Sequence, residues 1–336
     1  MLKTRDSLDR TFPNQLVLID DPYTVTDTDI WGTAEPLNIH GELYSSYLEP
    51  FGAFYRNTPD YTRKRVSWLS RSRNIRYQGK VGGPVYFRPR DQFPKEKERI
   101  SRNMTLRYDL TERGVQILKR TGRYHPIKHG GWKDHQIATG CITASLHLAM
   151  LHDNVPFITP DYIADDLGVT VPYTAPDGTH YKDHRLVFDY IFGARRRVHP
   201  IETDLGSEVG RAGTKKPDTE QFRRRKSYQR MYFQYSELIL RSQPDGGKLY
   251  NKAFRIPREN GLMPLFITTS KSKVQLMKDI ILEFTDGEGC NWFLMKYVPA
   301  KIFSAYESPK PLLELWTGPW ERAGRSDFYI NNPARQ

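Results

Sequence analysis

The stretch from residue 58 to residue 74, TPDYTRKRVSWLSRSRN, repeats apolar and basic positions at the spacing of a helix. It opens with Thr58, Pro59 and Asp60, which are typical of a helix start. One side of the predicted helix carries Thr62, Val66 and Leu69, and the opposite side carries Arg63, Lys64, Ser67 and Arg71. The pattern therefore predicts a helix that packs through one side and presents a basic surface on the other.

The segments around this helix predict a small domain over residues 37–122. The expected elements are a helix over 38–57 broken at Pro50, a hairpin over 75–90 turning at Gly82-Gly83, a strand over 106–110 and a helix over 111–122. Helix, basic helix, hairpin and helix, in that order, are typical of a winged helix-turn-helix.

In a winged helix-turn-helix the basic helix enters the major groove and the hairpin rests on the phosphates. The residues predicted to contact DNA are Arg63, Lys64, Ser67, Arg71, Arg73, Arg76, Lys80 and Arg88. The alternative is that Arg63, Lys64 and Arg71 form only a solvated helix face. Because the helix and the hairpin are both basic, the pattern favours contact with double-stranded DNA.

A second domain is predicted over residues 134–300, after a linker at 123–133. Its expected elements are helices at 134–152 and 218–241, strands near 185–193, 196–206, 262–270 and 291–300, and a helix between the last two strands. This order predicts an α/β (α+β) domain with a mixed sheet flanked by helices. Residues 1–36 are polar and acidic and predict a poorly ordered arm. Residues 301–336 form a C-terminal extension for which the pattern predicts no element.

The net charge of +12 over 336 residues is unevenly distributed along the chain. Residues 61–130 hold 19 Lys and Arg against 5 Asp and Glu, whereas residues 1–60 hold 4 against 10. Positive charge concentrated in this way attracts a polyanion through counterion release. A basic surface that served only solubility would not be confined to one segment.

Composition excludes several other classes of protein. Cys141 and Cys290 are too few for a disulfide framework or a Cys-rich zinc site, so a reducing interior is expected. No apolar run reaches the length of a membrane span, and the N-terminus lacks a signal-peptide core. We therefore expect a cytoplasmic protein of a bacterial host with no membrane partner. The phosphate-binding pattern GxxxxGK[ST] is missing, which argues against an ATP-driven motor.

Paired carboxylates stand out in residues 195–208, RRRVHPIETDLGSE. Glu202 and Asp204 are two apart in a predicted strand, so their side chains share one face. A tight turn at Gly193 would place Asp189 on the antiparallel neighbour, across from this pair. Three converging carboxylates repel one another, and Mg²⁺ or Mn²⁺ removes that repulsion with oxygen ligands. The alternative is that Arg195, Arg196 and Arg197 neutralise the carboxylates as ion pairs.

Asp189 followed by Glu202-x-Asp204, on two strands before a long helix, resembles the PD-(D/E)XK restriction-endonuclease-like core. The resemblance implies that Asp189 and Glu202 bind metal in a catalytic site. Asp204 stands where that family has a lysine, which is a departure from its pattern. Related nucleases carry the lysine on the following helix, where Lys226 is the candidate here.

Longer segments of the chain resemble the replication-relaxation family of plasmid and phage proteins. Its pattern has a Y-x-L-T-x-x-G segment, a helix-starting His, an Asp near a strand end, an E-x-D pair and an aromatic on the next helix. The matching residues are Tyr108, Leu110, Thr111, Gly114, His135, Asp189, Glu202, Asp204 and Tyr235. The resemblance implies a DNA-binding protein tied to the replication or transfer of a mobile element, and it does not itself establish cleavage.

Three hypotheses follow for the function. The first is a metal-dependent DNA endonuclease or nickase, in which Asp189, Glu202 and Asp204 hold Mg²⁺ or Mn²⁺ and Lys226 assists. The second is a non-catalytic regulator of replication or transcription with an inert nuclease-like fold. The third is a phage structural or packaging protein. Double-stranded DNA is the partner expected in the first two, and a homodimer and replication or phage proteins are further candidate partners.

Overall fold

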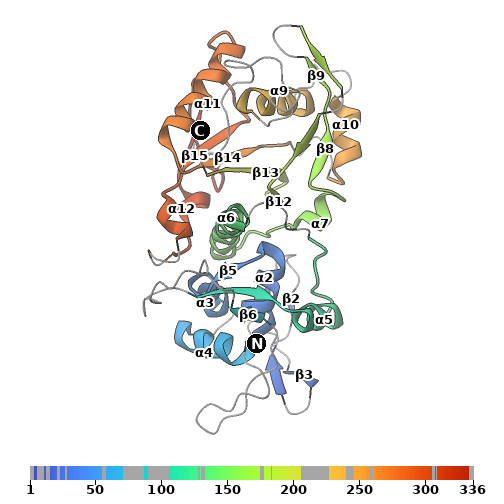
Figure 1. Cartoon of the computed structure of the whole chain (residues 1–336), viewed down its shortest axis with the longest axis vertical. Helices are drawn as coiled ribbons and strands as arrows, with labels where there is room; N and C mark the ends of the chain where they lie inside the picture. Colours follow the sequence, from blue (N-terminus) through green and yellow to red (C-terminus); the bar gives the residue numbers. More distant parts are fainter. Residues whose placement is uncertain are drawn as a thin grey trace, which may run out of the picture. The chain divides into compact units, whose positions relative to one another are not determined.

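The computed structural model describes the backbone of residues 29–54, 58–70, 106–127, 129, 133–174, 178–182, 184–205, 227–239, 246–256, 261–304, 307 and 309–332. It also describes the backbone of five short strands: β1 (Thr4–Arg5), β2 (Thr11–Phe12), β3 (Leu16–Asp20), β4 (Tyr23–Thr26) and β6 (Phe87–Pro89). Strand β1 pairs with β2, and β3 with β4, both antiparallel. The chain is a mixed α/β protein, as expected (Figure 1).

Two compact units divide the chain, and their boundaries differ from those predicted. The first unit comprises Met1–Phe157 with Ala300–Trp316, and the second comprises Ile158–Pro299 with Thr317–Gln336. The helix predicted at 134–152 to open the second domain packs instead in the first unit, because Ile137, Cys141 and Leu148 join its apolar core. The segment after residue 317, predicted as an extension, adds strands to the sheet of the second unit.

The first unit combines short helices with a three-stranded sheet. Its elements are the π-helix η1 (Ile30–Ala34), α2 (Glu35–His40), β5 (Leu43–Tyr44), α3 (Ser45–Phe54), α4 (Pro59–Leu69), β6, β7 (Arg107–Leu110), α5 (Glu112–Arg120), α6 (Lys133–His152), the 3-10 helix η3 (Ala300–Phe303) and α12 (Glu314–Thr317). The strand order is β5-β7-β6, and both pairings are antiparallel. From α2 to β7 the described elements therefore run helix, strand, helix, helix, strand, strand, and the last strand lies in the middle of the sheet.

Two predictions about this region are wrong. The helix expected over 38–57 is interrupted at Gly41, whose φ of 79° ends α2, and Pro50 lies inside the continuous helix α3. Residues 30–36, assigned to the poorly ordered arm, are helical and buried. Ile30, Trp31 and Ala34 supply an apolar face that this core covers, and that face outweighs the polar composition around it.

Helix α4 forms where the sequence predicted it and for the predicted reasons. The Thr58 side chain accepts a hydrogen bond from the backbone N–H of Tyr61, and Pro59 occupies the first helical position. Val66 and Leu69 are buried in the core of the unit. The described helix ends at Leu69, and the predicted hairpin turn at Gly82-Gly83 lies outside the described residues.

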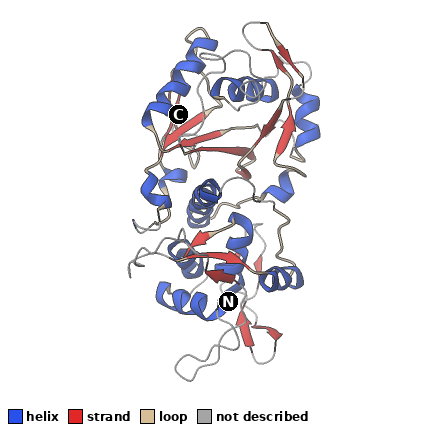
Figure 2. Cartoon of the chain, in the orientation of Figure 1, coloured by secondary structure: helices blue, strands red, loops and turns tan. Residues whose placement is uncertain are grey.

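The described residues of the second unit form one six-stranded mixed sheet and two further two-stranded sheets (Figure 2). Its strands are β8 (Gly168–Thr170), β9 (Tyr173–Thr174), β10 (His180–Tyr181), β11 (Arg185–Val187), β12 (Tyr190–Ala194), β13 (Arg197–Asp204), β14 (Leu265–Thr268), β15 (Leu294–Tyr297), β16 (Trp320–Arg322) and β17 (Arg325–Phe328). Its helices are α7 (Pro160–Ile163), α9 (Tyr228–Ile239), α10 (Gly246–Ala253) and α11 (Lys271–Phe284). The main sheet has the order β12-β13-β14-β15-β16-β17, with β13, β14 and β15 parallel and the outer pairs antiparallel.

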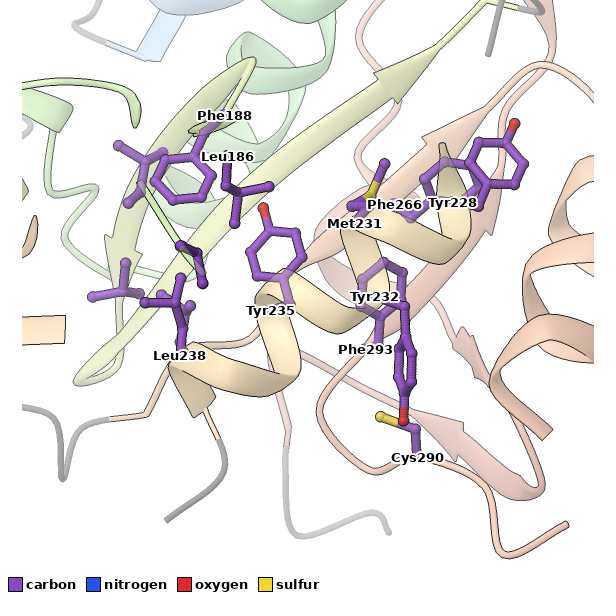
Figure 3. Packing of buried hydrophobic residues seen from close by; sticks show 14 of the residues in the cluster. Leu186, Phe188, Tyr228, Met231, Tyr232, Tyr235, Leu238, Phe266, Cys290 and Phe293 are labelled. Atoms are coloured by element: carbon purple, nitrogen blue, oxygen red, sulfur yellow. The ribbon is translucent and has the colours of Figure 1, made fainter. Parts of the chain in front are cut away.

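Helix α9 supplies three buried tyrosines, Tyr228, Tyr232 and Tyr235, to the aromatic core of this unit. Figure 3 shows Tyr228, Met231 and Tyr235 projecting from α9, with Phe266 of β14 and Phe293 nearby. The ring centroids of Tyr228 and Phe266 lie 5.0 Å apart in an edge-on contact, which favours a fixed position for the helix on the sheet. The three tyrosines of this helix, Tyr228, Tyr232 and Tyr235, therefore pack in the core. The hydroxyls of Tyr228 and Tyr235 donate to the carboxylates described below.

Among the described residues, no helix is both long enough and apolar enough to cross a bilayer.

Candidate functional site

Strand β13 brings Glu202 and Asp204 to one buried position beneath α9. Each carboxylate residue is 1% exposed. The Tyr235 hydroxyl donates a hydrogen bond of 2.7 Å to Glu202 Oε1, and the Tyr228 hydroxyl donates to Asp204 Oδ2. The two tyrosines are seven residues apart, which is about two helical turns, so both hydroxyls project from the same side of α9.

Lys273 joins this cluster from the first turn of α11. Its Nζ lies 2.8 Å from Asp204 Oδ2, and its side chain is 18% exposed. Thr268 at the end of β14 also donates to Asp204, at 3.5 Å. The sequence analysis did not identify Lys273. Its signal was the segment TTSKSK directly after a buried strand, because the carboxyl ends of parallel strands meet at one sheet edge.

Asp189 lies at the start of the same hairpin, and its carboxylate hydrogen-bonds to the backbone of the neighbouring strand. Its backbone N–H donates to the Ile201 carbonyl at 3.1 Å, and its Oδ2 accepts from the backbone N–H of Thr203 at 2.6 Å. The carboxylate thus replaces a backbone carbonyl at the end of the β12–β13 ladder. The register that pairs Tyr190 with Ile201 places Asp189 opposite Glu202, and the sequence alone had left this register open.

The turn of this hairpin falls at Arg195 and Arg196, which have φ values of 47° and 64°, and not at Gly193. Gly193 lies within β12, where a Cβ would stand 3.0 Å from the Cβ of Ile158. The arginine turn lies at the far end of β13 from Asp204, about 25 Å away at the usual rise of a strand. The alternative in which Arg195, Arg196 and Arg197 neutralise the carboxylates is therefore wrong.

We asked whether these side chains could hold the predicted Mg²⁺ or Mn²⁺. Across the part of the chain that the structure describes, no group of three or more His, Cys, Asp or Glu side chains is arranged to hold a metal ion. The donors to Glu202 and Asp204 described above are two phenols, the Thr268 hydroxyl and an ammonium group. As they stand, Asp189, Glu202 and Asp204 fit a hydrogen-bonded structural cluster, not a divalent metal site. Lys226, the other predicted catalytic residue, lies outside the described residues.

The predicted DNA-contacting residues are only partly described. Arg63, Lys64 and Ser67 lie on α4, with Arg63 and Lys64 exposed and Ser67 partly buried. The backbone of Arg88 forms part of β6. Arg71, Arg73, Arg76 and Lys80 lie outside the described residues.

Every basic side chain of α4 is paired with a carboxylate. Arg63 donates to both oxygens of Glu49, at 2.8 and 3.2 Å, and Lys64 lies 2.7 Å from Asp60. Arg65 makes a two-pronged contact with the buried Asp29. Water screens these exposed ion pairs, so Arg63 and Lys64 can exchange their partners for phosphate at little cost. Arg65 is held in place and positions the helix.

The motif Y-x-L-T-x-x-G has a local structural cause in the first unit. Tyr108 and Leu110 lie on β7, and the Thr111 side chain accepts from the Gly114 N–H at 3.2 Å, which caps α5. His135 lies in the first turn of α6, in the first unit.

Neither a family model, nor a curated protein, nor a solved structure matches this chain. The resemblances to the replication-relaxation family and to the PD-(D/E)XK core therefore rest on the residues and geometry given above.

Proposed function

We propose that this protein binds double-stranded DNA through its first unit. The observation that carries the proposal is the order helix, strand, helix, helix, strand, strand, with antiparallel strands in the order β5-β7-β6. This order supports a winged helix, in which the second helix of the helix-turn-helix pair is the reading helix. Helix α4 occupies that position and exposes Tyr61, Arg63 and Lys64.

The charge of the chain supports the same proposal. The excess of Lys and Arg is concentrated in residues 61–130, which include α4, β6, β7 and α5. Binding to a phosphate backbone releases counterions, so affinity is predicted to fall steeply as salt rises. The resemblance to plasmid and phage replication proteins suggests that the DNA belongs to a mobile element. The role would then be the control of its replication.

For the second unit we propose a nuclease-like but non-catalytic role. Its carboxylates are buried and accept hydrogen bonds from Tyr228, Tyr235 and Lys273, an arrangement that stabilises the sheet edge. An ionised group committed to protein donors must exchange them before it can bind metal.

The test of DNA binding uses the full chain, a labelled duplex and fluorescence anisotropy at several salt concentrations. Arg63→Gln and Lys64→Gln should each weaken binding and reduce the salt slope by about one unit. The exposed Lys301→Gln in the same unit serves as the charge-matched control. Salt-independent binding, no binding, or an equal effect of Lys301→Gln would contradict the proposal.

A Mg²⁺- or Mn²⁺-dependent endonuclease is the second candidate. It is favoured by one observation, the position of Lys273 beside Asp204, because this chain lacks a lysine at the third position of the E-x-D segment. Supercoiled plasmid incubated with either metal would be nicked, and Glu202→Ala would abolish nicking while duplex binding persists. Intact plasmid under all conditions supports the non-catalytic role. Copurification with virions, without duplex binding, would favour a phage structural or packaging protein instead.

A further inference from the structure

A cavity of about 640 Å³ lies at the amino ends of the parallel strands in the second unit. Arg197, the first residue of β13, lines it together with Met263 before β14 and Trp292 before β15. The hairpin of β16 and β17 closes one side with Arg322 and Arg325. The volume lies within the range of small-molecule sites. Asp204 is seven residues along β13 from Arg197, or about 23 Å, so this cavity is separate from the carboxylate cluster.

Three guanidinium groups converge on this cavity. Arg322 and Arg325 are direct cross-strand partners, a like-charge pair that is unfavourable without a compensating anion. The guanidinium carbons of Arg197 and Arg322 both lie over the Phe328 ring, 5.5 and 5.3 Å from its centroid. Among the described residues that line the cavity there is no Asp or Glu.

The hydrogen-bond partners of Arg197 and Arg322 among the described residues carry no charge, although Asp327 attracts Arg322. Arg322 donates to the Ser326 carbonyl at 2.7 Å and to its hydroxyl at 3.4 Å, and Arg197 contacts the Met263 sulfur at 3.6 Å. Burial lowers the pKa of Arg197, and burial followed by repulsion from Arg325 lowers the pKa of Arg322. Arginine nonetheless stays protonated at any ordinary pH. Three arginines in a cavity lining that contains no carboxylate favour a bound anion, and the attraction of Asp327 offsets only part of their charge.

The lining of the cavity also includes an aromatic surface. Trp292 is partly exposed, and one face of its ring stacks on Tyr232 with centroids 5.6 Å apart and planes 5° from parallel. A ring braced in this way is a rigid platform for a second flat group, and Asn291 beside it offers amide hydrogen-bonding groups.

We propose that this cavity binds a nucleotide, with its phosphate on Arg197, Arg322 and Arg325 and its base against Trp292. The same chemistry is presented by a free mononucleotide and by the 5′-phosphorylated end of a DNA strand. The inference does not rest on the winged-helix proposal, because the two sites use different residues in different units.

The test is calorimetric titration of the full chain with deoxyadenosine monophosphate, deoxyadenosine and inorganic phosphate. We expect the nucleotide to bind and the nucleoside to bind at least tenfold more weakly. Arg325→Gln should weaken nucleotide binding about tenfold or more, because it removes a charge-assisted hydrogen bond. Arg196→Gln, which removes the same charge from the exposed β12–β13 turn, should leave binding unchanged. Trp292→Leu should weaken binding of the nucleotide but not of phosphate.

A matched pair of single-stranded oligonucleotides, with and without a 5′-phosphate, separates the two sources of the ligand. If the chain binds the 5′-phosphorylated oligonucleotide more tightly, and Arg325→Gln abolishes this difference, the ligand is the end of a DNA strand. If the two oligonucleotides bind equally while the mononucleotide binds tightly, the ligand is a free nucleotide. Thermal unfolding of each variant confirms that the fold is retained. Failure of the nucleotide and of both oligonucleotides to bind at millimolar concentration overturns the proposal. Equal affinity for nucleoside and nucleotide would also overturn it. The same holds if Arg325→Gln and Arg196→Gln lose equal amounts of nucleotide affinity. Loss of duplex binding by Arg63→Gln bears only on the first unit.

Discussion

Tyr235 and Glu202 are joined by a buried hydrogen bond of 2.7 Å that links the middle of α9 to β13. The phenol is one of the donors that allow a carboxylate to lie in an apolar core, since a buried charge without partners is costly. The contact therefore predicts that Tyr235 has a structural role: it stabilises the folded second unit.

Tyr235→Phe should lower the free energy of unfolding of the second unit by about 1–3 kcal/mol, because Glu202 loses a donor while it stays buried. The substitution keeps the ring that packs against Phe293. Tyr329→Phe removes a hydroxyl from a partly exposed position in the same unit and is the control. Urea unfolding measures both, and equal stability of Tyr235→Phe and the unmodified chain would contradict a structural role for this bond.

Lys273→Met should destabilise the second unit by about 3 kcal/mol, because it leaves the fully buried Asp204 without its ammonium partner. Lys278 on the same helix pairs with the half-exposed Glu321, so Lys278→Met should cost no more than about 1 kcal/mol. Combining Lys273→Met with Asp204→Asn should restore much of the loss, since the remaining side chain is neutral. An additive double variant would show that the two groups do not interact.

The sequence predicted those features of the site that depend on neighbours along the chain. The two-residue spacing of Glu202 and Asp204 placed both on one face of β13. This relation follows from the strand period, which needs no knowledge of the rest of the fold. The sequence left open the register that sets Asp189 opposite Glu202, which depends on the turn at Arg195 and Arg196. The helix at α4 was likewise predicted from its cap and its apolar spacing.

The features that were missed depend on contacts between distant segments. Lys273 reaches Asp204 only because β14 pairs in parallel with β13, and sequence periodicity does not give strand order. Helix α6 is apolar around most of its circumference, so its pattern could not show which core it joins. The helix break was assigned to Pro50 because proline is the stronger general signal. The backbone instead leaves the helical conformation at Gly41, and the helix is continuous through Pro50.

Gly52→Ala should destabilise the first unit by about 1–3 kcal/mol through overpacking. A Cβ at Gly52 would overlap the side chain of Thr62 on α4, and a Cβ at Gly32 would lie 2.7 Å from the Gly52 Cα. The backbone of α3 at Gly52 therefore packs closely against both the Thr62 side chain of α4 and the backbone of η1 at Gly32, and neither contact leaves space for a methyl group. Because the displaced element is α4, duplex DNA affinity should fall with stability.

The companion variant Thr62→Ala tests this cause directly. It opens space beside residue 52, so the Gly52→Ala, Thr62→Ala double variant should recover part of both stability and DNA affinity. Urea unfolding and anisotropy measure the two quantities on the same preparations. A double variant no better than Gly52→Ala would place the cost in the glycine backbone and not in the α3–α4 contact.

The first unit also contains a buried histidine pair whose hydrogen bonds fix both tautomers. The Thr143 hydroxyl donates to the Gly140 carbonyl at 3.1 Å, so it accepts from His40 Nδ1 at 2.9 Å. His40 Nε2 then accepts from His147 Nδ1 at 3.0 Å. His147 Nε2 is left as a bare acceptor with no hydrogen-bond partner among the described residues, in a ring stacked on Phe157. If His147 Nε2 were protonated, the new N–H would have no hydrogen-bond acceptor among the described residues.

The pair predicts that the first unit loses stability in acid. Burial, followed by the charge of His125, lowers the pKa of His147 to about 3, and burial followed by His147 lowers the pKa of His40. Both rings take up protons near pH 6.5 once the chain unfolds, so the unfolded state binds more protons between about pH 6.5 and pH 3. Stability is complete above this window and falls within it by up to about 1.4 kcal/mol per pH unit for each ring.

His147→Phe should reduce this slope while keeping an aromatic ring beside Phe157, and the exposed His152→Gln on the same helix should not change it. The readout must be local, because burial lowers the pKa of His199 in the second unit to about 4. Hydrogen exchange of the α6 amides in urea, followed between pH 7.5 and pH 4.5, reports on the first unit. If α6 protection is unchanged by pH in the unmodified chain, or falls equally in His147→Phe, the two rings are not the neutral pair inferred from their hydrogen bonds.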